Sequence, residues 1–208
     1  MTFKKYVSKE DVKNYSIEKF TWKIFVIDDE VDVLKACLYL KKQKIIGFDT
    51  ESKPTFKKGV TSKVSLIQFS TEKKAFLFRI NKTGFKDEII DLISDKKIKK
   101  IGIAINDDIK DLQRIKKFES NNIIDLNQLA LKLGFESIGA VKLSILILGF
   151  SISKAVRLSN WEKMKLTTSQ IEYAATDAWI CNMIYNKLLN EGKIKNSWFF
   201  SLWNSINY

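Results

Sequence analysis

The chain has 208 residues, 45% of them hydrophobic, and a formal net charge of +12. This length suits one globular domain with a sizeable core, and the complete absence of histidine excludes Ser-His-Asp or Cys-His nucleophiles and zinc sites built on imidazole. The positive charge favours a polyanionic partner such as nucleic acid, although the excess is mostly lysine and is also typical of a general compositional bias.

No apolar run is long enough to span a bilayer, and the residues up to Tyr6 lack the apolar core of a secretory signal. The two cysteines, Cys37 and Cys181, lie far apart within apolar stretches. We interpret them as small buried side chains in a reducing compartment, not as a disulfide or a metal site. We therefore expect a cytoplasmic protein.

The first part of the chain predicts an extension, a strand and a helix. Residues 1–22 are polar and basic with scattered aromatic side chains, and we assign them to an N-terminal extension that precedes one domain at 23–191. Residues 23–27 predict a short strand, and Asp28 is the expected N-cap of the helix that follows, with two more acids in its first turn. The apolar residues of that helix are Val31, Leu34, Leu38 and Leu40.

The acidic stretch Asp28-Asp29-Glu30 also resembles the pocket of a two-component receiver domain. Such a domain needs a phosphate-accepting aspartate at the tip of a later strand. The candidate strand at 64–69 is followed by Ser70 and Thr71 instead. We therefore set the receiver interpretation aside.

The next predicted strand, at 45–49, ends in a pair of acids, Asp49 and Glu51. Side chains alternate along a strand, so these two carboxylates point to the same side. Converging carboxylates repel each other unless a cation or a shared proton lies between them, and oxygen ligands suit Mg²⁺ and Mn²⁺. A solvated strand end remains the simpler interpretation of the pair alone, so a metal site requires further ligands.

The remaining elements predict an α/β fold. Strands are expected at 64–69 and 75–78, and the short connection between them favours an antiparallel meander with 45–49. After a helix with an apolar face, strands at 98–104 and 123–124 alternate with helices, and the rest of the chain is predicted to be helical. A meander followed by alternating strands and helices indicates a mixed sheet.

Two further acids stand at places from which they can reach a site. Asp107 follows the strand at 98–104; an isolated aspartate there is more commonly a helix N-cap, but Asp108 could provide the cap and leave Asp107 free. Tyr173 and Asp177 are four residues apart and share one helix face. Small residues around Asp177 favour close packing, where a carboxylate is costly unless it is paired or bound to a metal.

Four segments, taken in order, resemble the motifs of the DEDD superfamily of exonucleases. They are GFDTE at 47–51, SLIQ at 65–68, GIAIND at 102–107 and YAATDA at 173–178. The tyrosine in the last segment resembles the tyrosine branch, and KAVRLSNW at 154–161 resembles the Werner-syndrome-type 3′–5′ exonuclease domain, with ribonuclease D as a cousin. Asn106, where relatives often carry glycine, and the additional Asp108 depart from the pattern without removing a ligand.

The resemblance implies a ribonuclease H-like mixed sheet flanked by helices and a metal-dependent 3′–5′ exonuclease, an activity associated with DNA repair. Asp49, Glu51, Asp107 and Asp177 would hold two divalent ions, Mg²⁺ or Mn²⁺. Tyr173 would orient the attacking water, and Glu51 would also be catalytic. Two such cations can stabilise both the attacking and the leaving oxygen of a phosphodiester. Whether DNA or RNA is the substrate stays open.

Three residues are candidate contacts to the nucleic acid: Thr50, Lys154 and Arg157. Plain surface charge is the alternative for the two basic residues. Trp161 has apolar neighbours and is predicted to lie in the core, not to stack on bases. The aromatic tail at 192–208 is expected to pack on the domain, with base stacking as the less favoured interpretation.

The alternative function is a nucleic-acid-binding module on the same fold without catalysis. The presence of all four acids and of Tyr173 argues against an inactive enzyme. A third possibility, the receiver domain, lacks an acceptor residue.

Overall fold

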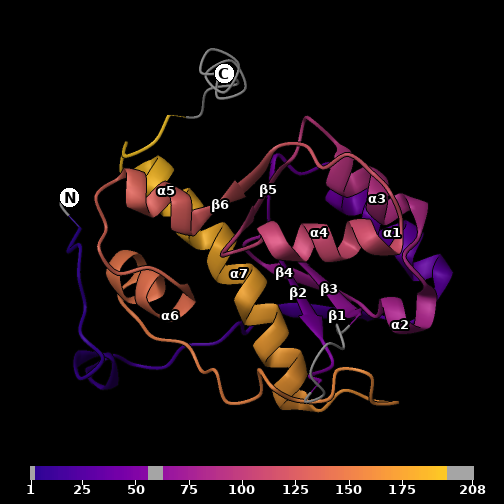
Figure 1. Cartoon of the computed structure of the whole chain (residues 1–208), viewed down its shortest axis with the longest axis horizontal. Coiled ribbons are helices and arrows are strands. Elements are labelled where there is room, and N and C mark those ends of the chain that lie inside the picture. Colours follow the sequence, from indigo (N-terminus) through magenta and orange to yellow (C-terminus); the bar gives the residue numbers. More distant parts are fainter. Residues whose placement is uncertain (1–2, 56–62, 196–208) are drawn as a thin grey trace.

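A mixed six-stranded sheet forms the centre of the computed structural model, which describes residues 3–55 and 63–195 (Figure 1). The strand order is β1-β4-β3-β2-β5-β6. The strands are β1 (Lys23–Ile27), β2 (Ile45–Ser52), β3 (Val64–Ser70), β4 (Lys74–Phe78), β5 (Lys99–Gly102) and β6 (Ile123–Asp125). The predicted α/β fold class is therefore confirmed.

The central strands form the expected antiparallel meander. β2 pairs antiparallel with β3, and β3 pairs antiparallel with β4. β1, β5 and β6 each pair parallel with a neighbour, which makes the sheet mixed. β2 runs as far as Ser52, further than predicted, so Asp49 and Glu51 both belong to the strand and their alternation is fixed by sheet pairing.

Helices cover both faces of the sheet. One core lies beneath α7 and the helices α5 and α6, and the other lies beneath α1, α3 and α4. Because both faces are covered, every residue of β3 is buried, including its polar residues Ser65, Gln68 and Ser70. The helices are α1 (Glu30–Leu40), α2 (Ile80–Thr83), α3 (Asp87–Ser94), α4 (Asn106–Ile115), α5 (Leu126–Lys132), α6 (Ala140–Leu143) and α7 (Thr168–Asn190), with a 3₁₀ turn η1 (Asp11–Asn14) and a π-helix η2 (Ser144–Leu148).

The long helix α7 lies unusually close to the sheet. Thr167 and Gln170 form a capping box that begins the helix, and α7 then runs across the sheet face as the gold ribbon of Figure 1. A Cβ atom on Gly47 would overlap the backbone carbonyl of Ala178. Glycine at this position of β2 therefore permits the approach that brings α7 beside the acidic end of the strand.

The start of α1 differs from the prediction. The N-cap is Asp29, whose side chain accepts a 2.9 Å hydrogen bond from the backbone N–H of Asp32. Asp28, the predicted cap, instead pairs with Lys82 at 3.0 Å. One additional extended residue places Asp29 where its carboxylate reaches the free N–H groups of the first turn.

The apolar face predicted for α1 is also wrong for three of its four residues. The helix buries Val33, Ala36, Cys37 and Leu40, whereas Val31, Leu34 and Leu38 are 47–62% exposed. Both sets are spaced for one helix face. The buried set includes the small residues Ala36 and Cys37, so side-chain size alone does not identify the buried face.

The N-terminal extension packs on the domain over its described residues. Phe3, Val7 and Phe20 are buried, and the backbone N–H of Phe20 donates to the hydroxyl of Thr176 on α7 at 3.0 Å. The C-terminal aromatic tail lies almost wholly outside the described residues, and its predicted packing stays a prediction.

Cys37 and Cys181 are buried and free. In the described part of the chain, no helix has the length and apolarity needed to cross a membrane.

Candidate active site

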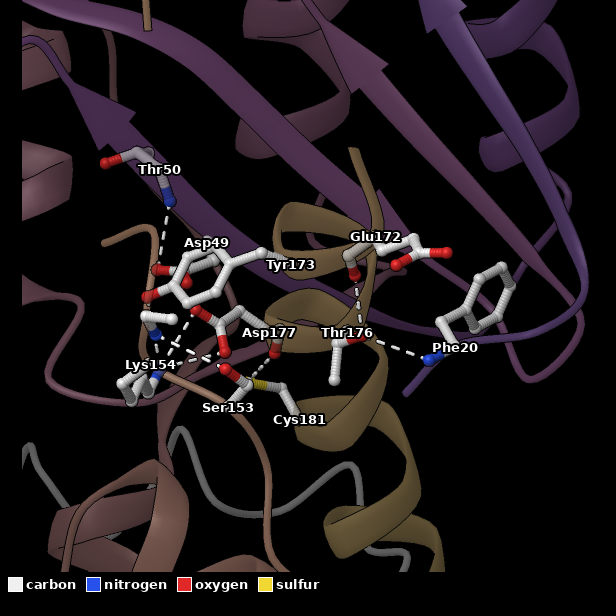
Figure 2. Close-up of polar contacts among 11 residues, drawn as sticks. Phe20, Asp49, Thr50, Ser153, Lys154, Glu172, Tyr173, Thr176, Asp177 and Cys181 are labelled. Carbon is white, nitrogen blue, oxygen red and sulfur yellow. Dashed lines mark hydrogen bonds and ion pairs between the residues drawn. The ribbon is translucent and has the colours of Figure 1, made fainter. Parts of the chain in front are cut away.

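Three carboxylates meet where β2 ends beside α7. Asp49 and Glu51 point from β2, and Asp177 points from α7. One carboxylate oxygen from each lies within 4.8 Å of the other two. Figure 2 shows Asp49, Asp177 and Tyr173 converging from the strand and the helix. The structure therefore brings together four of the residues that the sequence singled out.

Asp107, the expected third acid along the chain, does not face this cluster. Its side chain is 88% exposed and pairs with Lys110 at 3.0 Å. The neighbouring Asp108 lines the same pocket as Asp49 and accepts a hydrogen bond from the hydroxyl of Thr50. The structure thus places Asp108, not Asp107, with the other carboxylates.

The orientation of α4 about its own axis explains why Asp108, and not Asp107, lines the pocket. Ile109 and Leu112 are the buried residues of this helix, so they fix which side faces the sheet. Asp108 precedes Leu112 by four residues and lies on that side, whereas Asp107 lies on the polar face. Neither acid caps the helix, because the N-cap position belongs to Ile105 and makes no side-chain cap. The apolar phase of α4 was the sequence signal that identifies Asp108.

The four carboxylates line a pocket of about 280 Å³. Its other walls come from the loop before α4, from α6 and from the segment that leads to α7. The lining residues besides the acids are Thr50, Ile103, Ala104, Ala140, Lys154, Arg157, Tyr173 and Cys181. All three predicted substrate contacts therefore line the pocket.

Lys154 lies deeper in the cluster than a surface phosphate contact would. Its Nζ is 2.8 and 2.9 Å from the two carboxylate oxygens of Asp177 and donates a longer hydrogen bond, 3.4 Å, to the hydroxyl of Tyr173. One ammonium group thus offsets part of the charge of four carboxylates. Arg157 also lines the pocket and is exposed.

The close approach of the acids shifts their protonation. Burial raises the pKa of Glu51 to about 9, with further contributions from Asp49 and Asp177. Burial, followed by repulsion from Asp177 and Asp108, raises the pKa of Asp49, while Lys154 and the backbone N–H of Thr50 oppose the shift. These shifts indicate carboxylates held together against their repulsion, which is the electrostatic condition of a cation site.

Tyr173 stays neutral in this setting. Burial, followed by the charges of Asp177 and Glu51, raises the pKa of its hydroxyl above the ordinary value. Its ring packs against Trp161, which is fully buried and lies 6.0 Å away between ring centroids. The prediction that Trp161 belongs to the core is confirmed, and Trp161 limits the positions that the Tyr173 ring can adopt.

The raised pKa of Glu51 predicts how stability depends on pH when a chelator keeps cations away. The folded-state pKa of about 9 exceeds the ordinary 4.5. The contribution of Glu51 to folding stability is therefore fully present below about 4.5 and is lost as pH rises through 9. We expect the unfolding free energy to fall by up to about 1.4 kcal/mol per pH unit in this window. Urea denaturation at several pH values measures the slope. Glu51→Gln should flatten it, and an unchanged slope would show that Glu51 ionises normally.

Comparison with protein families matches residues 24–193 to a family of 3′–5′ exonucleases. A putative 3′–5′ exonuclease of Acanthamoeba polyphaga mimivirus is 34% identical over 169 residues, which cover 73% of this chain and 41% of that protein. The bifunctional 3′–5′ exonuclease/ATP-dependent helicase WRN of Mus musculus is 36% identical over 157 residues, which cover 71% of this chain and 11% of that protein. The chain spans less than half the length of these two curated relatives.

Solved structures share the fold. The Nibbler EXO domain of Aedes aegypti superposes with a TM-score of 0.77 at 22% identity, covering 85% of this chain and 93% of that one. Trypanosoma brucei RNase D in complex with RNA U12 superposes with a TM-score of 0.73 at 19% identity, covering 82% and 63%. The mixed sheet flanked by helices is thus the arrangement of these exonuclease domains.

Proposed function

The chain belongs to the family of 3′–5′ exonucleases, and on this premise we propose that it hydrolyses nucleic acid phosphodiester bonds from the 3′ end with two divalent cations, Mg²⁺ or Mn²⁺. Its fold is the ribonuclease H-like fold that the sequence predicted. The observation that carries the proposal is the convergence of Asp49, Glu51 and Asp177 oxygens within 4.8 Å. The fourth ligand in this proposal is Asp108.

The donor set fits hard divalent cations. All four candidate ligands are carboxylates, and hard cations prefer oxygen ligands. Burial raises the pKa values of Asp49 and Glu51, and repulsion from neighbouring carboxylates raises them further; a bound cation would relieve that repulsion. Thr50 donates to Asp108 and so fixes the orientation of one ligand.

In the proposed hydrolysis, the side chains around the cluster have different roles. Bound cations would supply positive charge beside the phosphate and acidify water. The neutral hydroxyl of Tyr173 would hold the attacking water by a hydrogen bond. A Glu51 carboxylate oxygen would accept a second hydrogen bond, donated by the same water. Arg157, exposed in the same pocket, would contact the phosphate backbone.

Tyr173→Phe tests the orienting role. We expect this change to lower kcat by about 10- to 100-fold, because water loses one positioning hydrogen bond while the carboxylates stay in place. Mn²⁺ affinity, measured by titration calorimetry without nucleic acid, should stay within about twofold of the wild-type value. An equal loss of Mn²⁺ affinity would mean that Tyr173 organises the carboxylates instead.

The activity itself is tested with labelled strands. A 5′-labelled strand should shorten progressively in Mg²⁺ or Mn²⁺, whereas a 3′-labelled strand should release labelled mononucleotide from the first turnover. EDTA and Asp49→Ala should each abolish both signals. Binding without metal-dependent shortening would favour the alternative, a nucleic-acid-binding module. Matched DNA and RNA strands, single-stranded and with recessed 3′ ends, identify the preferred substrate.

A further inference from the structure

Lys154 lies against Asp177, on one side of the carboxylate cluster (Figure 2). Its ammonium contacts both oxygens of that carboxylate, at 2.8 and 2.9 Å. Asp177 is 4% exposed, whereas the side chain of Lys154 is 33% exposed. The ion pair therefore joins a buried, fixed acid to a base that remains accessible from the pocket.

The backbone of Lys154 is held less firmly by secondary structure than the backbones of the three acids. Asp49 and Glu51 are fixed by sheet pairing and Asp177 by α7, but Lys154 lies in a segment without helix or strand. The four-carbon stem of lysine has many rotamers. In this same position Nζ lies 5.1 Å from the centroid of the Tyr173 ring, which adds a weaker attraction for the ammonium.

A divalent cation and the Lys154 ammonium compete for the same oxygens. Both would have to approach the single carboxylate of Asp177, and like charges at contact distance repel strongly in a partly buried pocket. An ammonium that uses both oxygens leaves a cation at Asp177 fewer free lone pairs. The proposed cofactor can therefore bind fully only if Lys154 moves.

We propose that Lys154 is a positioning residue with two alternative anionic partners, Asp177 without cofactor and the phosphate backbone of nucleic acid with cofactor. This inference rests on the proposed function. When a divalent cation binds, the ammonium leaves Asp177 and turns toward the pocket opening, where Arg157 also lies. The same side chain thus links cation binding to nucleic acid binding, and the coupling is reciprocal.

The first test measures Mn²⁺ affinity without nucleic acid, by titration calorimetry on the whole chain. Lys154→Met keeps the apolar stem and removes the competing charge, so we expect about 10-fold tighter binding. Lys154→Arg keeps the charge and should stay within about threefold of the wild type. Arg157→Met is the matched control: it removes one charge from the same pocket, and this charge acts on the Asp177 carboxylate more weakly than Lys154 does, so we expect less than about a twofold change.

The second test measures nucleic acid binding by fluorescence anisotropy, with a short strand whose terminal linkages are phosphorothioates and with Ca²⁺ as the oxygen-liganded cation. The wild type should bind more tightly in Ca²⁺ than in EDTA. In Lys154→Met this gain should shrink by about 5-fold or more, because no ammonium is released toward the phosphates.

The outcomes separate the inference from the proposed function. Unchanged or weaker Mn²⁺ binding by Lys154→Met would overturn the inference. Lys154 would then be a structural brace, that is, a residue that stabilises the folded carboxylate cluster without competing with a cation. Lys154→Gln, which retains a neutral hydrogen-bond donor, is measured alongside; if both neutral variants unfold in EDTA by circular dichroism, the brace interpretation holds and the inference fails. If neither the wild type nor any variant binds Mn²⁺, the proposed function itself fails.

Discussion

Asp108→Asn is expected to lower the rate of 3′-end hydrolysis by at least about 100-fold, whereas Asp107→Asn should change it by less than about threefold. The two substitutions are chemically identical and one residue apart, so they differ only in which way the side chain points. Asp108 lines the carboxylate pocket and is held by Thr50, while Asp107 is 88% exposed beside Lys110. A metal ligand lost from the pocket reduces cation affinity and turnover together.

Initial rates on the labelled strand and Mn²⁺ titrations of both variants provide the measurement. Asp108→Asn should weaken Mn²⁺ binding by about 10-fold or more, and Asp107→Asn should leave it unchanged. Thermal unfolding of both variants controls for misfolding. The reverse ranking, with Asp107→Asn the more damaging, would return the third ligand to the residue that the sequence motif suggested.

Local sequence signals predicted the strands because each strand obeys a local rule. β1 and β4 are short apolar runs bounded by polar turns, and the short connection from β3 to β4 leaves no room for a crossover helix. These signals act over a few residues and need no knowledge of the rest of the chain. The parallel partners of β1 and β6 carry no such local signal, since parallel pairing joins segments distant in the sequence.

The face of α1 could not be predicted by counting large apolar residues. Val31 and Leu34 have helical spacing but are exposed, whereas Ala36 and Cys37 are buried. Side-chain size alone favours burial of the first pair, but the structure buries the second. Which face is buried depends on the elements that the helix packs against, and these are distant in the sequence.

The same distinction separates the predicted site residues that the structure brings together from Asp107, which lies outside the pocket. Asp49 and Glu51 are linked by the two-residue period of a strand, and Tyr173 and Asp177 by the four-residue spacing that brings two side chains to one helix face. Adjacent acids such as Asp107 and Asp108 have no such relation, so only the rotation of α4 distinguishes them.

The ion pair of Lys154 with Asp177 lay beyond any periodic rule. Lys154 belongs to an irregular segment, and Asp177 follows it by 23 residues in the sequence. Its direction is set by the carboxylates that attract it, not by local backbone periodicity. Charge in the pocket, which is a property of the assembled fold, therefore determined where this side chain lies.

Asp49→Asn should abolish hydrolysis, by about 1,000-fold or more, while making the cation-free chain more stable. Asp49 is the second-largest cause, after burial, of the raised pKa of Glu51, so removing its charge relieves repulsion at the centre of the cluster. Asparagine keeps the size of the side chain and an oxygen that can accept the 3.0 Å hydrogen bond from the N–H of Thr50. We expect a gain of about 1 kcal/mol, or a rise in Tm of about 2–4 °C in EDTA.

Thermal unfolding with and without Mn²⁺ makes this prediction quantitative. The wild type should gain stability in Mn²⁺ by mass action, about 2.7 kcal/mol at a free concentration 100 times the Kd, and Asp49→Asn should lose most of that gain. Asp107→Asn, which lies outside the pocket, is the control and should behave as the wild type in both conditions. An Asp49→Asn chain that is less stable in EDTA yet still stabilised by Mn²⁺ would separate Asp49 from the cation site. Both expected effects have one cause: the Asp49 charge that repels the neighbouring carboxylates without cations is the charge that would attract Mn²⁺.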